Sequence, residues 1–72
     1  MSEITLSAID RIFRHAGAKR VSSEATEALR NVTENISLEI AKKALELANH
    51  RKRQTPNYED VRQAYRLLKS SG

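Results

Sequence analysis

The stretch between Gly17 and Pro56 constrains the fold of this chain more than any other feature. Apart from the short segment 18–22, nothing in it interrupts a helix, so one long helix is expected over Ser23–His50. Its apolar residues recur every three or four positions: Ala25, Leu29, Val32, Ile36, Ile40, Ala44 and Leu47. Four more apolar residues in its second half widen the apolar arc there to roughly 200°, about twice what a surface helix needs.

Two shorter helices are expected beside it, over roughly Thr5–Ala16 and Pro56–Lys69, because no segment alternates apolar and polar residues for long enough to indicate a strand. Each has about a dozen residues, so together they cannot cover the middle helix, which is roughly 40 Å long. A second long helix from another chain could cover it. The sequence therefore predicts an all-α fold, one domain over residues 1–72, and dimerisation.

The helix boundaries have chemical reasons. Gly17 is expected to cap the first helix, because glycine adopts positive φ without a steric penalty. Either Ser22 or Ser23 is expected to cap the middle helix through its hydroxyl oxygen. Thr55 and Pro56 predict the N-cap and first residue of the third helix, a position where the missing proline N–H is not needed.

Composition excludes several classes of protein. The chain has no cysteine, which excludes disulfides and thiolate metal sites, and His15 and His50 are too few and too far apart to indicate zinc. No metal or cofactor is expected. No apolar run could span a membrane, and the N-terminal segment carries Glu3 and Asp10 instead of a signal sequence. A soluble intracellular protein is expected.

The basic residues are concentrated at the two ends of the chain. Residues 1–21 carry four basic and two acidic side chains, residues 22–49 three and five, and residues 50–72 six and two. Such asymmetry indicates a polyanionic partner held by particular surfaces, although ordinary solubility charge would also account for it.

Four short segments at fixed spacings resemble the loops of a known family. The sequence AGAKRVS at 16–22 is similar to the first loop of archaeal histones. LANH at 47–50, RQT at 53–55 and EDV at 59–61 are together similar to the second loop of that family. Single pieces are common in proteins, but the joint set at these spacings is specific, and it covers nearly the whole chain.

The resemblance implies the histone fold, in which short, long and short helices of two chains cross as a handshake dimer. The first loop of one chain then lies beside the second loop of its partner, so the basic ends of the sequence merge into a continuous rim. Duplex DNA would bend round this rim. Bending costs several kcal/mol and is offset by phosphate contacts and minor-groove arginines that read no sequence.

The implied function is sequence-nonspecific binding, bending, wrapping and compaction of chromosomal DNA by a homodimer in the cytoplasm, on the nucleoid. Growth into tetramers or longer polymers on DNA, and pairing with a paralogous histone, are left open. The DNA-binding residues that the resemblance implies are Arg11, Arg14, Lys19, Arg20, Lys52, Arg53, Gln54 and Thr55.

Individual residues receive roles from the same resemblance. Arg20 is expected to enter the minor groove beside Thr55 of the partner's second loop, while Arg11 and Arg14 share one helix face that contacts the DNA backbone. Arg53 is expected to form an ion pair with Asp60 that fixes the second loop. For the three exposed arginines, the alternative is an ordinary solvated surface.

Contacts between dimers are also implied. Leu47, His50 and Asp60 are expected to form a contact between two dimers, and a His–Asp pair there would weaken as the imidazole loses its proton. Gly17 is expected to allow close stacking of successive dimers on DNA, besides capping its helix.

Several positions depart from the family. Gln54 replaces a common lysine and Asn49 a frequent arginine, while Pro56 and Tyr58 replace apolar and small residues. The basic residues at positions 51 and 52, where the family often has small ones, would compensate for the charge missing at Gln54. The strength of DNA binding and assembly is therefore open.

Three other functions compete with DNA packaging. Histone folds also serve as heterodimerisation subunits of transcription or assembly complexes, which is the main alternative. A helix-turn-helix reader of a specific site is disfavoured, because the long uninterrupted helix leaves no short recognition helix. An enzyme is excluded by the lack of a nucleophile–base set, a metal cluster or a phosphate-binding glycine loop.

Overall fold

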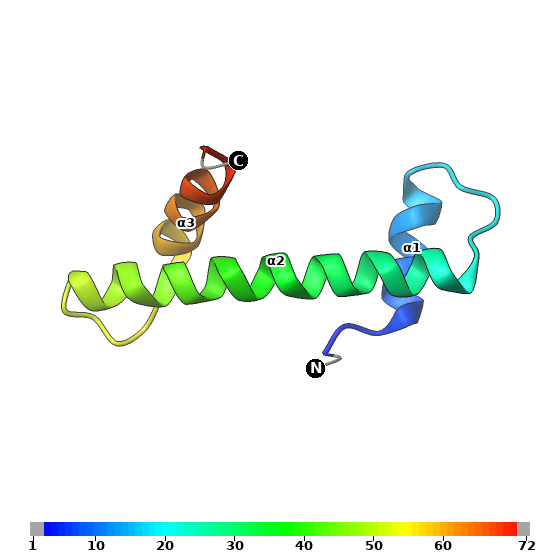
Figure 1. Ribbon diagram of the computed structural model, residues 1–72. Helices are drawn as coiled ribbons and strands as arrows, with labels where there is room; N and C mark the ends of the chain where they lie inside the picture. The colour runs from blue at the N-terminus through cyan, green and yellow to red at the C-terminus, as the bar shows by residue number, and fades with distance from the viewer. Residues whose placement is uncertain (1–2, 71–72) are drawn as a thin grey trace. The chain divides into compact units, whose positions relative to one another are not determined.

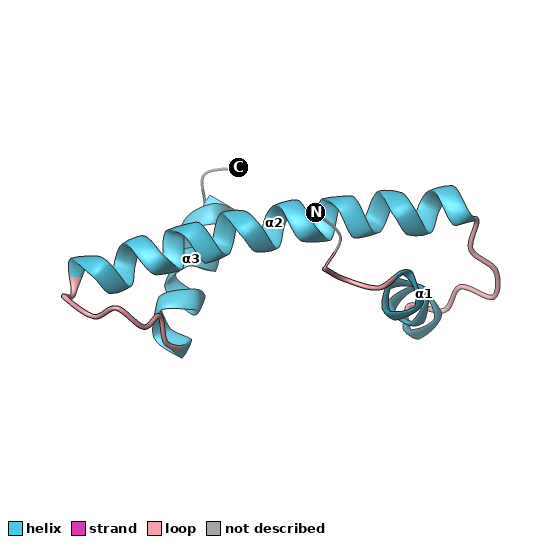
Figure 2. Ribbon diagram, turned by 90° about the horizontal axis from the view of Figure 1, so that it is seen from below, coloured by secondary structure: helices cyan, strands magenta, loops and turns pink. Residues whose placement is uncertain are grey.

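A computed structural model describes residues 3–70, which form three helices and no strand (Figures 1 and 2). The helices are α1, Leu6–His15; α2, Ser23–His50; and α3, Tyr58–Ser70. The prediction of an all-α chain with a short, a long and a short helix is confirmed, and α2 has the bounds expected from the sequence. With 28 residues, α2 is about 42 Å long.

Two compact units divide the chain within α2, one ending at Asn35 and the other beginning at Ile36. The first unit holds α1 and the first half of α2, and the second holds the rest of α2 and α3. Each unit is a separate packing problem. One domain over residues 1–72 stays a prediction, of which residues 1–2 and 71–72 lie outside the described range.

Both ends of α1 are capped by local hydrogen bonds. The Thr5 hydroxyl accepts a hydrogen bond of 3.1 Å from the backbone N–H three residues later. At the other end Gly17 has φ +108°, as the sequence predicts for a glycine cap. The N–H of Gly17 donates to the carbonyl of Arg14, and that of the next residue to the carbonyl of Phe13, both at 3.0 Å. This pair of bonds is the Schellman motif, which satisfies carbonyls that the helix leaves open.

Ser22, rather than Ser23, caps the start of α2. Its hydroxyl accepts a hydrogen bond of 3.1 Å from the Ala25 N–H. Its carbonyl accepts another of 3.1 Å from the hydroxyl of Thr26, a residue with 8% of its surface exposed. The sequence left the two serines as alternatives, and these bonds decide between them because a capping side chain accepts from the N–H two or three residues on.

The end of α2 repeats the Schellman motif without a glycine. The N–H of Lys52 donates to the carbonyl of Asn49, and that of Arg53 to the carbonyl of Ala48, both at 2.9 Å. Lys52 stands where Gly17 stands in the first loop and has φ +60°. A lysine in this left-handed region is strained, because its Cβ approaches the neighbouring carbonyl oxygen.

The third helix begins two residues later than the sequence predicts. It starts at Tyr58, so Thr55 is not its N-cap and Pro56 is not its first residue. Asn57 and Asp60 explain the difference. The Asp60 N–H donates to Asn57 Oδ1 at 3.1 Å, and the Asn57 N–H donates to Asp60 Oδ2 at 2.9 Å. This reciprocal capping box satisfies two backbone donors at once, which a threonine cap before proline cannot do.

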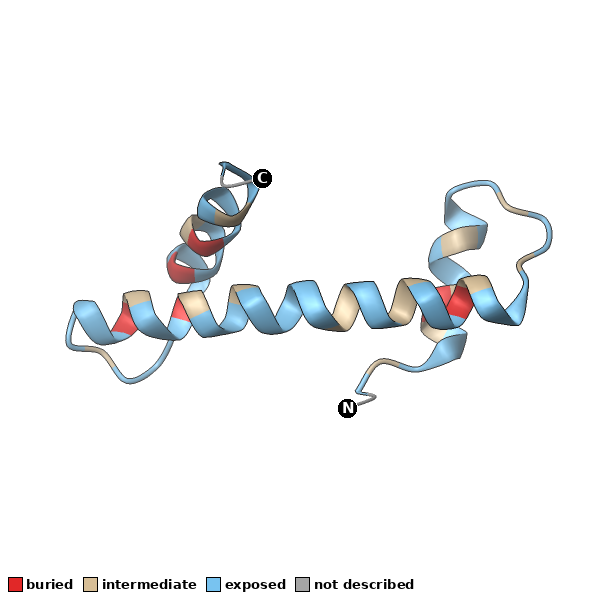
Figure 3. Ribbon diagram, viewed as in Figure 1, coloured by how far each residue is buried: buried red, intermediate tan, exposed pale blue. Residues whose placement is uncertain are grey.

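Few side chains are buried within either unit (Figure 3). In the first unit α1 contributes Ile9, which is completely buried, and α2 contributes Thr26. In the second unit Ala44 and Ala48 of α2 and Ala64 of α3 are buried. Alanines let the two helices approach closely but exclude little apolar surface from water, so each unit has a small core.

Most large apolar side chains stay exposed in the single chain. Eight of them are between 38% and 52% exposed: Leu6, Ile12, Val32, Ile36, Leu38, Leu45, Val61 and Leu67. Scattered single apolar residues are ordinary on protein surfaces, but such a series along three helices is typical of a surface that another chain covers.

Candidate nucleic-acid interface

The first loop, residues 16–22, presents two cations. Lys19 and Arg20 are both exposed. Among residues 3–70, neither forms an ion pair with an acidic side chain. The Schellman motif at Gly17 fixes where the loop leaves α1, and the cap at Ser22 fixes where it enters α2. The loop is therefore held at both ends and keeps its charge available to an anion.

Arg11 and Arg14 lie on one exposed face of α1, where with His15 they line a shallow depression. Only Arg11 is without an acidic partner in the described range. Arg14 Nε donates to Asp10 Oδ2 at 2.8 Å, with 56% of the arginine side chain and 36% of the aspartate side chain exposed. The sequence reasoning overlooked this pair, although Asp10 and Arg14 have the i,i+4 spacing that brings helix side chains together.

The second loop, residues 51–57, presents a mixed surface. Lys52, Gln54 and Thr55 are exposed, and Arg53 is half-buried. The left-handed conformation of Lys52 turns the chain there and completes the end of α2. The structure thus places all four predicted residues in one loop, with Lys52 as the cation that has no acidic partner among residues 3–70.

Arg53 and Asp60 lie together, as the resemblance implies. Arg53 Nη2 donates to both carboxylate oxygens of Asp60, at 3.0 and 3.1 Å. Asp60 is completely buried, whereas 35% of the Arg53 side chain is exposed. A buried carboxylate is tolerable only when it is paired and hydrogen-bonded, so this arginine fixes the second loop to α3 while turning part of its charge toward solvent.

A second arginine shares the same carboxylate. Arg51 Nη1 donates to Asp60 Oδ1 at 3.0 Å, and Arg51 Nη2 donates to Gln63 Oε1 at 2.8 Å. The sequence reasoning gave Arg51 only a diffuse positive charge. Nothing in the spacing indicates the contact, because it depends on how the loop returns to α3. Arg51 therefore joins the end of α2 to two turns of α3.

The residues implied in a contact between dimers do not contact one another through hydrogen bonds within one chain. Leu47 is half-buried, and His50 is exposed beside a shallow depression that Glu46 and Asn49 also line. Asp60 is buried under the two arginines of the second loop. The contact between dimers stays a prediction, and its acidic member is already occupied within its own chain.

Gly17 has open space around it. A Cβ built on this residue meets no atom within 4 Å, so the positive φ, and not crowding within the chain, is what requires glycine here. The predicted stacking of dimers at this position concerns atoms outside the chain.

The described residues carry no feature of two other classes of site. Among residues 3–70, no three histidine or acidic side chains gather where they could hold a metal ion. None of the helices in that range is long and apolar enough to cross a membrane.

Comparison with known proteins gives a consistent result. Residues 2–65 match the family described as histone-like transcription factor (CBF/NF-Y) and archaeal histone. The chain is 47% identical over 64 residues to the first, or A, subunit of archaeal histone HAN1 from Thermococcus zilligii, a match that covers 89% of this chain and 96% of that protein. It is 44% identical over 66 residues to a probable archaeal histone 3 of Methanocaldococcus jannaschii, covering 92% and 98%.

The family match and the two relatives confirm what the loop motifs indicate. Both relatives match over nearly their whole length, at the level of identity where fold is shared. The order of helices in the structure is the one that the resemblance implies. The family consists of non-enzymatic proteins, and this chain belongs to it: it is a member of the histone-like CBF/NF-Y and archaeal histone family.

Proposed function

We propose that this chain binds duplex DNA without reading sequence and that, as a homodimer on the chromosome, it bends, wraps and compacts that DNA. The observation that carries the proposal is the pair of capped loops that present Lys19, Arg20 and Lys52 to solvent with no acidic partner in the described range. Membership of the histone family supports the same function.

The dimer is supported by the exposed apolar face of α2. Val32, Ile36, Leu38 and Leu45 lie along it with 44% to 51% of their surface exposed. A second copy of α2 crossing this face would remove that surface from water, at roughly 25 cal/mol for each Å² of apolar area buried. The crossing would be the handshake in which the first loop of one chain lies beside the second loop of the other.

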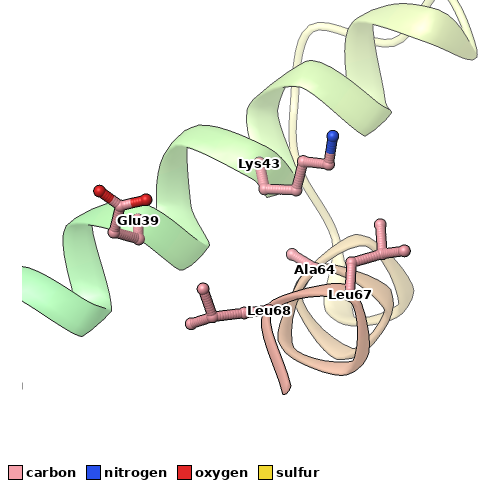
Figure 4. A pocket seen from close by; sticks show the side chains of 5 residues that line it. All are labelled: Glu39, Lys43, Ala64, Leu67 and Leu68. Atoms are coloured by element: carbon pink, nitrogen blue, oxygen red, sulfur yellow. The ribbon is translucent and has the colours of Figure 1, made fainter. Parts of the chain in front are cut away.

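A shallow groove in the second unit offers a further apolar contact. Glu39 and Lys43 of α2 and Ala64, Leu67 and Leu68 of α3 line it (Figure 4). Leucines of α3 border it, so a partner helix laid across α2 would extend apolar contact onto α3. The groove is too open and too lightly charged to favour a small-molecule site.

The chemistry of binding follows from charge. Each phosphate neutralised by a lysine or arginine releases counterions, so affinity falls steeply as salt rises. Arg20 would enter the minor groove beside Thr55 of the partner. Arg11 and Arg14 would contact the backbone, with Lys19, Lys52, Arg53 and Thr55, while the amide of Gln54 would contribute a neutral hydrogen bond. None of these contacts distinguishes bases in the manner of a major-groove helix.

Assembly beyond the dimer forms a second part of the proposal. Leu47 and His50 would meet their counterparts from another dimer, with Asp60 as the acidic partner, and Gly17 would let successive dimers approach closely. The exposed position of His50 and the open space around Gly17 support this arrangement. Growth along DNA into tetramers or polymers would follow.

Nuclease digestion of long duplex DNA saturated with the protein tests the function. A ladder of evenly stepped protected fragments is expected if dimers wrap and stack, and one short protected size if dimers wrap singly. Arg20→Ala is expected to weaken binding to unrelated DNA sequences alike, whereas Glu27→Gln, a matched change on an exposed residue of α2, is expected not to weaken it. Absence of protection at low salt would contradict DNA packaging.

Membership of a heterodimer is the second candidate, because one relative is named as one of the subunits of an archaeal histone. In that case the apolar face of α2 would prefer a different histone chain to a second copy. Sedimentation of the purified chain distinguishes the two. A homodimer at micromolar concentration supports the first candidate, and a monomer that pairs only with a paralogous histone supports the second.

A further inference from the structure

One face of α3 carries charge that neither loop uses. It is formed by Tyr58, Arg62, Tyr65, Arg66 and Lys69, and is called the α3 basic face below. At 100° for each residue, these five side chains fall within about 100° of the helix circumference. All five are exposed, with Tyr58 at 67% and Tyr65 at 48%. Four of them line a common shallow depression.

The cations of this face have no acidic partner among residues 3–70. Asp60 lies on the buried side of the helix and is already paired with the second loop. Glu59 borders the face at the first turn only. A solvated helix surface usually alternates charges of both signs, so three cations at positions 62, 66 and 69 without an interleaved carboxylate are unusual.

The tyrosines hold two of the cations along the helix. Arg62 Nη1 donates to the Tyr58 hydroxyl at 2.8 Å, and its guanidinium lies 5.5 Å from the centre of that ring. Lys69 Nζ lies 5.3 Å from the centre of the Tyr65 ring. Such cation–π contacts lower the freedom of the long side chains without neutralising their charge. The face is therefore ordered and still positive.

We propose that the α3 basic face is a second binding surface for the phosphate backbone of duplex DNA, separate from the two loops. The inference rests on the proposed function, since it assumes a DNA-bound dimer. Arg62 and Lys69 are separated by seven residues, or about 10.5 Å along the helix, a length over which a duplex presents about six phosphate charges. Arginine, lysine and tyrosine side chains all contact phosphate oxygens.

The phosphates have two sources, which the loops cannot tell apart. They belong either to the duplex that the loops of the same dimer wrap or to a second duplex that the dimer bridges to the first. A dimer would carry two such faces, one on each α3. Bridging would draw separate DNA segments together, and contact with the wrapped duplex would lengthen its path on the protein.

The test compares the full chain with the triple variant R62A/R66A/K69A. Alanine favours helix, so α3 is expected to remain folded, and circular dichroism together with the thermal midpoint checks this. Binding of a single duplex is measured at several salt concentrations. Bridging is measured as the capture of a labelled duplex by bead-bound DNA. Arg20→Ala is the control that weakens the loop surface and leaves the α3 basic face intact.

Either of two results supports the proposal. Capture of the second duplex falling at least five-fold, with single-duplex affinity nearly unchanged, identifies bridging. A decrease of about 0.9 in the salt slope for each phosphate that the variant no longer neutralises, with no capture by either protein, identifies contact with the wrapped duplex. Tyr58→Phe, which removes only the hydroxyl, is expected to produce a smaller change in the same direction.

Three results overturn it. Unchanged capture and salt slope would exclude the α3 basic face alone and leave the loop surface intact. Loss of self-association in the triple variant without DNA, with an unchanged salt slope, would make the face a contact between copies of the chain. Failure of the unmodified chain to bind duplex DNA at low salt would overturn the proposed function, and the inference with it.

Discussion

Arg51 Nη1 donates to Asp60 Oδ1 at 3.0 Å, the oxygen that Arg53 Nη2 also occupies at 3.0 Å. The other oxygen accepts from Arg53 and from the Asn57 N–H. A carboxylate offers about four acceptor positions, so Asp60 is saturated within its own chain. An imidazolium from another dimer would therefore have to displace one of these donors. Arg51 is the most dispensable of them, because 46% of its side chain is exposed and Arg53 alone already bonds both oxygens.

Arg51→Ala is expected to strengthen association between dimers. The substitution frees one acceptor position on Asp60, and a hydrogen bond to a charged group contributes roughly 1.5–3 kcal/mol, which the loss of loop rigidity partly offsets. The dissociation constant between dimers is expected to fall about three- to ten-fold in analytical ultracentrifugation. Gln63→Ala is the matched control, because it removes the other contact of Arg51 and leaves Asp60 occupied. Equal effects of both variants would contradict this account.

Lys52→Gly is expected to stabilise the fold. It removes the strain of a lysine at φ +60°, which is worth roughly 1–2 kcal/mol. Lys52→Ala keeps the strain and removes the charge. Thermal unfolding at fixed protein concentration should therefore show a higher midpoint for the glycine variant alone. Both variants should reduce the salt slope of DNA binding by about 0.9 for each phosphate left without its cation, since both remove the same charge. A lower midpoint for Lys52→Gly would show that the side chain stabilises the loop.

Asp10→Asn is expected to raise the affinity for DNA. The carboxylate of Asp10 holds Arg14 Nε at 2.8 Å and would also repel phosphate. Its removal should raise affinity by roughly two- to five-fold at low salt and increase the salt slope, because Arg14 becomes available to the backbone. Fluorescence anisotropy across a salt series measures both quantities. In the double variant with Arg14→Ala most of the gain should disappear. Equal gains in either background would mean that Arg14 does not contact DNA.

Glu34 is expected to make the start of α1 sensitive to acid. The Ile4 N–H donates to its carboxylate at 2.9 Å and lowers its pKa below the ordinary 4.5, with further lowering by the Glu3 N–H and Arg30 and opposition from desolvation. A carboxyl group with a lowered pKa stabilises the folded state fully above about pH 4.5 and loses that contribution as the pH falls through its folded-state pKa.

Amide exchange measures this effect directly. The Ile4 amide should lose protection as the pH falls below about 4.5, after correction for intrinsic exchange, and Glu34→Gln should lack this step. Glu39→Gln is the control, because no backbone N–H among the described residues donates to Glu39. A transition that persists in Glu34→Gln would assign it to another carboxylate.

Gly17→Ala is expected to destabilise the chain by roughly 1–2 kcal/mol, since the cost is that of positive φ alone. Denaturant unfolding measures it. At a temperature where the variant remains fully folded, nuclease protection then tests the stacking role. Loss of only the longer protected fragments would support close approach of dimers at Gly17, and an unchanged ladder would leave it as a cap only.

The parts of the fold that the sequence predicts well depend on local patterns. The bounds of α2 follow from unbroken helical spacing and the glycine cap at Gly17 from the need for positive φ. The predicted start of α3 was wrong because two capping signals overlap there. Thr55 before Pro56 resembles a cap, but the reciprocal bonds of Asn57 and Asp60 satisfy more donors.

The site was less predictable, because its contacts depend on side-chain reach. The left-handed lysine at position 52 is not indicated by composition, since glycine is the usual residue there. The link from Arg51 to Asp60 spans nine residues across a turn, and no periodic rule predicts it. The pair of Asp10 and Arg14 could have been predicted, because one helical turn separates them.

The small core of each unit has a thermodynamic consequence. Ile9 is the one large aliphatic side chain that is fully buried in the described part of a single chain, so an isolated chain has little free energy with which to offset its lost conformational entropy. Folding and pairing then become a single bimolecular reaction, and the fraction of native protein depends on concentration. Dilution alone should unfold it. A cell could thus adjust how much DNA is packaged through the synthesis rate of this chain, with unpaired copies removed by proteolysis.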